Sequence, residues 1–198
     1  MSTTSPVDVR VFFNFRSPYC YLASKTMFTL FDAYRVRLLF RPLAGWHGRS
    51  EPERAAKKIS VVRQDVARHA RRLGIPFQPP PPTTDPTKAA ILSLLVNDRP
   101  ELRAYVTAVM HAEWAEGRDI GDADVILTLA ESVGIGREEA LRAFENPDYR
   151  ATLDEHWAEA QALRVFGVPS FVIGDEVFWG KDRLDFVREH LDALGARR

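Results

Sequence analysis

Strand-like segments occur only near the two ends of this 198-residue chain, and this separation constrains the fold more than any other feature. Residues 7–15 begin with alternating apolar and polar positions and end in an aromatic run, which predicts a strand buried on at least one face. Ser17 and Pro18 predict the start of a helix reaching about residue 32, because serine caps free N–H groups and proline fits the first helical position. Residues 35–40 predict a second strand, so the chain opens with a parallel strand–helix–strand unit.

The middle of the chain, residues 50–163, has apolar residues at three- and four-residue spacing and is predicted to be helical. The proline-rich residues 75–86 cannot continue a helix and predict an extended surface connector without a recognition role. The predicted helices cover residues 52–73, 86–96, 100–117, 122–133, 137–144 and 148–163.

The chain ends with two short strand-like runs, residues 169–173 and 176–179, separated by a Gly-Asp pair that is typical of an antiparallel hairpin. A final amphipathic helix is expected over residues 182–194, with Leu184, Val187, Leu191 and Leu194 on one face. We therefore predict an α/β protein with one four-stranded mixed sheet. Residues 1–45 and 164–198 would form the unit that holds this sheet, and residues 46–163 an inserted helical domain.

Composition restricts the partners of the protein. The chain has 27 basic and 27 acidic residues, so neither nucleic acid nor an anionic membrane is expected, and a small-molecule partner fits better. No window reaches the roughly 18 apolar residues of a membrane helix, and the first seven residues do not resemble a targeting signal, so we expect a cytoplasmic protein. The five histidines show no spacing typical of a metal site.

Two segments at opposite ends of the chain carry a shared pattern. Residues 13–23 read FNFRSPYCYLA, and residues 167–172 read GVPSFV, followed by FWGKDRL at 178–184. They resemble the motifs D-x-x-S-P-[FY]-S-[YW]-L-[AG] and G-V-P-T-F with W-G-x-D-R of the 2-hydroxychromene-2-carboxylate isomerases and kappa-class glutathione transferases. The resemblance implies a DsbA-like thioredoxin fold with a large helical insertion, glutathione as cofactor and a homodimer.

The resemblance also implies roles for five residues. Ser17 would orient the thiolate of glutathione, and Val168, followed by a cis Pro169, would pair its main chain with the cysteinyl part. Asp182 would bind the γ-glutamyl ammonium group, and Lys181 would assist with the neighbouring carboxylate. A helix N-terminus independently favours an anion such as a thiolate. The alternative interpretations are that Ser17 only caps its helix and that Asp182 only complements a helix dipole.

Cys20 is the only cysteine, so an intramolecular disulfide is impossible. Because Ser17 stands where dithiol oxidoreductases have their attacking cysteine, the ordinary thioredoxin redox cycle is disfavoured. Cys20 itself follows three residues later, where a helix terminus could lower its thiol pKa or where it could pack as a small buried hydrophobe. Both interpretations remain open at this point.

The second substrate is expected beyond the carboxyl ends of the parallel strands. The candidates for contacting it are Tyr19, Cys20, Trp46, His47, Arg49 and Lys57, with Lys58 as an alternative to Lys57. The sequence departs here from the family pattern, because residues 45–50 lack its asparagine and Asn14 replaces its aspartate.

These residues favour a glutathione-dependent isomerase of an aromatic ring-cleavage intermediate, of the 2-hydroxychromene-2-carboxylate to hydroxybenzylidenepyruvate type. The expected partner is a small aromatic or conjugated carboxylate. The alternatives are a kappa-type transferase or peroxidase that consumes glutathione, another thiol-dependent oxidoreductase of the DsbA family, and a binding module of the same fold without catalysis.

Overall fold

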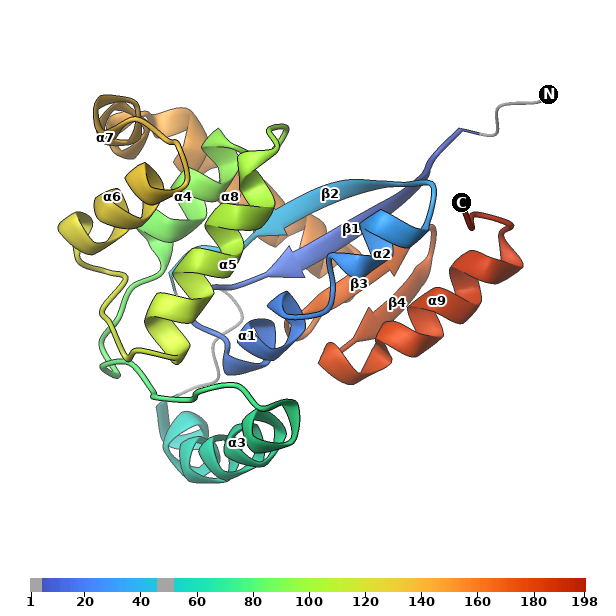
Figure 1. The fold of residues 1–198 in the computed structure, drawn as a ribbon, viewed down its shortest axis with the longest axis horizontal. Coiled ribbons are helices and arrows are strands. Elements are labelled where there is room, and N and C mark those ends of the chain that lie inside the picture. Colours follow the sequence, from blue (N-terminus) through green and yellow to red (C-terminus); the bar gives the residue numbers. More distant parts are fainter. Residues whose placement is uncertain (1–4, 46–51) are drawn as a thin grey trace.

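The computed structural model describes residues 5–45 and 52–198 and shows one four-stranded mixed sheet with helices on both faces (Figure 1). The strands are β1 (Val7–Phe13), β2 (Val36–Pro42), β3 (Ser170–Ile173) and β4 (Glu176–Trp179), in the spatial order β2-β1-β3-β4. Strands β1 and β2 are parallel, whereas β3 is antiparallel to both β1 and β4. The two ends of the chain therefore build one sheet, as predicted.

Side chains of the central strands alternate between two cores. Val11 and Phe13 on β1 belong to the larger buried cluster together with Phe171 on β3. Phe12 points to the opposite face and packs with Val172. This alternation is the period of two expected for a strand, and the antiparallel register of Val11 with Phe171 brings like faces together.

Each helix predicted in the middle of the chain is present, with boundaries that differ by at most three residues. The connector over residues 75–86 is not helical, as predicted. Residues 52–73 are helical over their whole length. The helices of this part are α3 (Pro52–Leu73), α4 (Thr87–Leu95), α5 (Glu101–Trp114), α6 (Ala123–Ser132), α7 (Arg137–Glu145) and α8 (Pro147–Ala162).

The helix predicted from Ser17 to residue 32 is wrong in its length, because it is two helices, α1 (Pro18–Ser24) and α2 (Thr29–Ala33). Between them the N–H of Thr26 donates to the carbonyl of Ala23 at 2.9 Å, a three-residue spacing that tightens the chain. The hydroxyl of Ser24 also donates to the carbonyl oxygen of Tyr21 at 2.7 Å. The resulting turn buries Met27 in the core.

The last helix also differs from its prediction. A short 3₁₀ turn, η1 (Lys181–Arg183), precedes α9 (Leu184–Ala193), so Asp182 lies before the helix and not at its first turn. Leu184, Val187 and Leu191 are buried as expected. Leu194 follows the end of α9 and is 52% exposed, so it does not continue the buried face.

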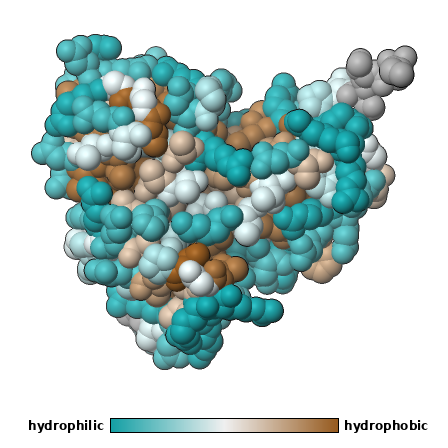
Figure 2. Space-filling model, viewed as in Figure 1, coloured by the Kyte–Doolittle hydropathy of each residue, from teal (hydrophilic) through white to brown (hydrophobic). Residues whose placement is uncertain are grey.

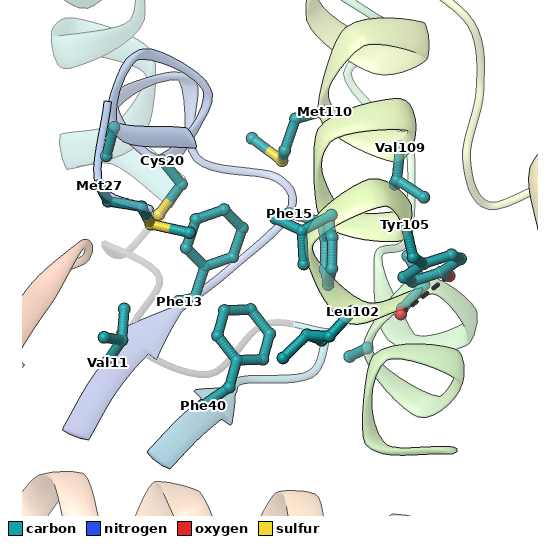
Figure 3. Close-up of a cluster of buried hydrophobic side chains, with 14 of the residues drawn as sticks. Val11, Phe13, Phe15, Cys20, Met27, Phe40, Leu102, Tyr105, Val109 and Met110 are labelled. Carbon is teal, nitrogen blue, oxygen red and sulfur yellow. Dashed lines mark hydrogen bonds between the residues drawn. The ribbon is translucent and has the colours of Figure 1, made fainter. Parts of the chain in front are cut away.

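The helical part and the sheet share one core. Phe13 and Phe15 from the first strand region lie in the same cluster as Tyr105, Val109 and Met110 of α5 (Figure 3). On the other face, α8 covers the sheet through Ala160. Glu159 of α8 pairs there with arginines of β1 and β2, at 2.9 Å from Arg10 and 2.7 Å from Arg41.

The surface drawn in Figure 2 is mainly hydrophilic, with hydrophobic residues gathered over the helical end and near the junction with α3. Within the described residues, no helix has the combined length and apolar character needed to cross a membrane.

Candidate active site

A cleft of about 780 Å³ lies where α1 begins, between α3 and the segment that follows β4. It is lined by parts of the chain that are far apart in sequence. Its lining residues are Ser17, Pro18 and Tyr19; Lys58, Val62, Asp65 and His69 of α3; Phe166, Gly167 and Val168; and Trp179, Gly180, Lys181, Asp182 and Arg183. The two motifs of the sequence therefore meet in one concave site.

Ser17 occupies the N-cap of α1 and is only partly buried. Its Oγ accepts a hydrogen bond from the N–H of Cys20 at 3.4 Å, so Ser17 caps the helix. The same hydroxyl donates to the carbonyl oxygen of Val168 at 3.4 Å. Both bonds are long, and the hydroxyl can exchange either of them for a ligand atom in the cleft.

Val168 and Pro169 are joined by a cis peptide bond, as predicted. Val168 lines the cleft, whereas Pro169 is buried behind it and accepts a hydrogen bond from the N–H of Gly180 at 2.9 Å. Among the described residues the N–H of Val168 has no hydrogen-bond partner. An unpaired main-chain donor in a cleft can bind an extended peptide-like ligand.

Two glycines allow the walls of the cleft to approach each other. A Cβ atom at Gly167 would overlap the indole nitrogen of Trp179. Gly180 has a φ of 110°, a conformation that other residues rarely adopt, and a Cβ there would lie 2.8 Å from Oδ1 of Asp182. The close positions of Trp179 and Asp182 therefore depend on the absence of side chains at these two sites.

The turn η1 places charges of both signs at the rim of the cleft. Oδ2 of Asp182 lies 2.7 Å from Nη1 of Arg183, and the two side chains are 57% and 46% exposed. Lys181 lines the cleft from the same turn. This rim can bind a ligand that carries an ammonium group beside a carboxylate.

Helix α3 supplies the opposite wall with polar side chains. The hydroxyl of Tyr19 donates to Oδ2 of Asp65 at 2.9 Å, and Nε2 of His69 lies 3.8 Å from the same oxygen. Burial, followed by the hydrogen bond to Asp65, raises the pKa of Tyr19 to about 12. The Tyr19 hydroxyl is therefore neutral near physiological pH.

Only some of the residues predicted to contact the second substrate line the cleft. Tyr19 lines the cleft. Of the two lysines considered, Lys58 lines it, whereas Lys57 is exposed and pairs with Glu53 at 2.9 Å. The choice of Lys57 was wrong because consecutive residues of a helix point about 100° apart. Trp46, His47 and Arg49 lie outside the described residues.

Cys20 does not line the cleft. Its side chain is fully buried and points toward Phe13 in the main core, near Met27 (Figure 3). Burial raises the pKa of the thiol to about 12. The expectation that Cys20 contacts a substrate is therefore wrong and its interpretation as a packing residue is confirmed, because its place in the first turn of α1 faces the core.

Sequence reasoning gave no role to several residues of the cleft, among them Phe166, Trp179, Asp65 and His69. Phe166 and Trp179 are 69% and 50% exposed, with ring centroids 4.6 Å apart. Phe166 directly precedes the second motif, and Asp65 stands four residues before His69 on one helix face, so both signals were present in the sequence. Among the described residues, no group of three or more histidine, cysteine or acidic side chains is arranged to hold a metal ion.

Residues 8–192 match the family described as the DSBA-like thioredoxin domain. The chain belongs to this DSBA-like family. It is similar to a 2-hydroxychromene-2-carboxylate isomerase of Sphingobium xenophagum, with 30% identity over 193 residues, covering 91% of this chain and 95% of that protein. An isomerase of the same name from Pseudomonas putida is 27% identical over 194 residues, covering 94% of this chain and 95% of that protein.

Solved structures agree with the sequence comparison. A 2-hydroxychromene-2-carboxylate isomerase matches with a TM-score of 0.83 and 25% identity, covering 94% of this chain and 95% of that chain. A probable DsbA oxidoreductase from Streptomyces coelicolor has a TM-score of 0.76 at 19% identity, covering 97% of this chain and 92% of that chain, and shows the fold alone. The predicted fold and the predicted resemblance of this DSBA-like protein to the isomerases are thus confirmed.

Proposed function

We propose that this DSBA-like protein is a glutathione-dependent isomerase of an aromatic ring-cleavage intermediate, converting an acid of the 2-hydroxychromene-2-carboxylate type into its open-chain hydroxybenzylidenepyruvate isomer. The observation that carries the proposal is the convergence of Ser17, Val168 and Asp182 in one cleft. These residues come from motifs about 150 residues apart, and the resemblance of those motifs to a known family assigned them to one ligand. The names of the relatives supply the substrate class.

The residues of the cleft fit glutathione, which is a peptide with two carboxylates, one ammonium group and one thiol. The unpaired N–H of Val168 suits its main-chain-like cysteinyl part. Asp182 suits the ammonium group, and Lys181 suits the carboxylate beside it. The absence of a side chain at Gly180 lets Asp182 lie close to the main chain of Gly180, which is itself hydrogen-bonded to Pro169.

When bound, glutathione supplies a thiolate that adds to the conjugated double bond. The bond is then single and can rotate until the thiolate leaves again. Ser17 contributes a hydroxyl whose hydrogen can turn from the carbonyl of Val168 toward a sulfur anion. The start of α1 adds only a weak positive field, because Pro18 has no N–H and those of Cys20 and Tyr21 are bonded to Ser17. Because α1 has only seven residues, the proposal assigns the stabilisation of the thiolate mainly to the hydroxyl of Ser17.

The aromatic half of the substrate is assigned to Phe166 and Trp179. Large aromatic side chains exposed in a cleft have surface available for stacking on a flat ring. Lys58 provides the cation for the substrate carboxylate, and it has no ion-pair partner among the described residues. Together these groups would hold a planar aromatic acid against the thiol site.

Calorimetric titration with glutathione, combined with a spectroscopic assay of chromene acid isomerisation, tests the proposal. We expect binding, turnover that requires glutathione, and full recovery of glutathione afterwards. S-methylglutathione is the matched control, because it can fill the same site without offering a thiol and should inhibit. Absence of glutathione binding would contradict the proposal, and stoichiometric loss of glutathione would instead identify a transferase or peroxidase.

The homodimer and the cytoplasmic location stay predictions. Light scattering coupled to size-exclusion chromatography measures the mass in solution and tests the first of them.

A further inference from the structure

The wall of the cleft formed by α3 carries polar side chains to which the proposed addition and elimination of glutathione assigns no role. Asp65 and His69 are four residues apart and therefore share one face of the helix. Their side chains are 39% and 33% exposed, so both reach the cleft while remaining partly sheltered. Asp65 accepts the hydrogen bond of Tyr19. The same oxygen lies 3.8 Å from Nε2 of His69, which is beyond hydrogen-bond distance but close enough for the carboxylate to attract the imidazole when it carries a proton.

We propose that His69, positioned by Asp65, is the catalytic acid–base group that moves a proton between two oxygen atoms of the electrophile. This inference rests on the proposed isomerase function and adds a residue of the helical insertion to its machinery. Nothing in the two motifs points to His69.

Among the described residues of the cleft, His69 fits this proton transfer better than Tyr19 or Ser17. Tyr19 gives its hydrogen to Asp65, and its pKa of about 12 keeps it from acting as a base at neutral pH. Ser17 is assigned to the thiol. Histidine is the side chain that ordinarily exchanges protons near neutral pH. The charged and titratable groups that share the cleft with His69 are Asp65 and Lys58 on α3, Tyr19 on α1, and Lys181, Asp182 and Arg183 on η1.

The substrate class requires such a proton transfer. A 2-hydroxychromene-2-carboxylate has a hydroxyl group and the ring oxygen on the same carbon. Ring opening breaks the bond from this carbon to the ring oxygen, while the hydroxyl loses its proton and its oxygen becomes a ketone. The ring oxygen leaves with the electron pair of the broken bond and gains a proton to become a phenol. His69 would accept the first proton and deliver the second, so protons and electrons balance without a further reactant.

The variant His69→Gln tests this role, because glutamine keeps a polar side chain of similar reach but cannot exchange protons. We expect kcat for isomerisation to fall about 100-fold, which is the usual size of a general acid–base contribution. The affinity for glutathione should stay unchanged. The matched control is His111→Gln, since His111 also lies beside a carboxylate, 3.4 Å from Glu116, but outside the cleft. The control should keep wild-type kcat.

Two further readouts separate a catalytic role from a structural one. Asp65→Asn should lower kcat less than His69→Gln and should shift the pH profile of kcat, because His69 remains present without its positioning partner. In an NMR titration without glutathione, the unreactive analogue chromone-2-carboxylate should move the imidazole signals of His69 but not those of His111. Unmoved His69 signals would contradict the proposal.

The experiments distinguish a failure of the role proposed for His69 from a failure of the proposed isomerase function. If the wild-type protein isomerises the chromene acid and His69→Gln does so equally fast, only the role of His69 is overturned. If the wild-type protein neither binds glutathione nor isomerises the acid, the proposed function is overturned together with this inference.

Discussion

The two walls of the cleft are built in different ways. The wall that we assign to the thiol consists of Ser17, Val168 and the turn η1, all supplied by the segments that form the sheet. It depends on main-chain groups, a cis peptide bond and two glycines. The opposite wall consists of side chains from one helix, α3, which Figure 1 shows set apart from helices α4 to α8.

From this difference we infer that the thiol wall binds one unchanging ligand, whereas the α3 wall can be adapted to different second substrates. Main-chain donors held by a sheet keep their positions whatever the neighbouring side chains are, so they suit a ligand that does not change. Side chains such as Lys58 and His69 can be replaced without disturbing the sheet, because α3 is attached through few buried residues, among them Val66 and Ala70. The α3 wall is therefore where we expect the choice of electrophile to be made.

The largest effect is expected on the thiol wall, from Ser17→Ala. Loss of its hydroxyl should lower kcat/KM by about 10²–10³, the size seen when one donor to a developing anion is removed. Loss of the N-cap should also lower the free energy of unfolding by about 1 kcal/mol. Steady-state kinetics at saturating glutathione and urea unfolding measure the two effects.

The control for Ser17→Ala is Ser132→Ala, because Ser132 also donates to a main-chain carbonyl, at 2.7 Å, but lies at the end of α6. It should leave kcat/KM unchanged. Unchanged turnover and an unchanged pKa of the bound glutathione thiol in Ser17→Ala would contradict the assignment of Ser17.

The next effect is expected from Gly167→Ala, which tests whether the thiol wall depends on the close approach of Trp179. The added methyl group would overlap the Trp179 indole, and overpacking of this kind costs about 1–3 kcal/mol of stability. Urea unfolding measures the loss, and glutathione titration should show weaker binding. Gly136→Ala is the control, because a Cβ there meets nothing within 4 Å. Equal stability of the two variants would show that Trp179 moves aside freely.

A smaller effect is expected on the α3 wall, from Lys58→Ala. The KM for the chromene acid should rise roughly threefold to tenfold, because an exposed charge pair contributes up to about 1 kcal/mol and a better-sheltered one somewhat more. The dissociation constant for glutathione should not change. Lys57→Ala is the matched control, since its side chain pairs with Glu53 outside the cleft. A rise in KM from Lys57→Ala alone would reverse the assignment.

The smallest effect on activity is expected from Cys20→Ala, although Cys20 lies within three residues of Ser17. Activity should stay at the wild-type level, with a loss of about 1 kcal/mol in stability from the smaller core side chain. In the wild-type protein a thiol reagent should react only upon unfolding, because burial raises the pKa of Cys20 to about 12 and the thiolate is the reactive form. Rapid labelling of the native protein would contradict this.

Much of the fold was predictable from the sequence because its signals are local. Period-two alternation predicted β1, and a Gly-Asp pair between two strand-like runs predicted the hairpin of β3 and β4. Three- and four-residue spacing predicted helices such as α3, and a serine–proline pair predicted the start of α1. The break between α1 and α2 was not predictable from that pattern, because it depends on the burial of Met27 in a core shared with distant segments.

The candidate site divides in the same way. The sequence by itself determined that two contiguous motifs, around Ser17 and around Val168–Pro169, flank a helical insertion, and their resemblance to a known family predicted the residues of the thiol wall. Only the tertiary structure decided that Cys20 faces the core, that Lys58 rather than Lys57 reaches the cleft, and that Asp65 joins Tyr19 to His69. These features depend on how α3 is rotated and packed against α1, and such packing arises from contacts between residues that are remote in the sequence.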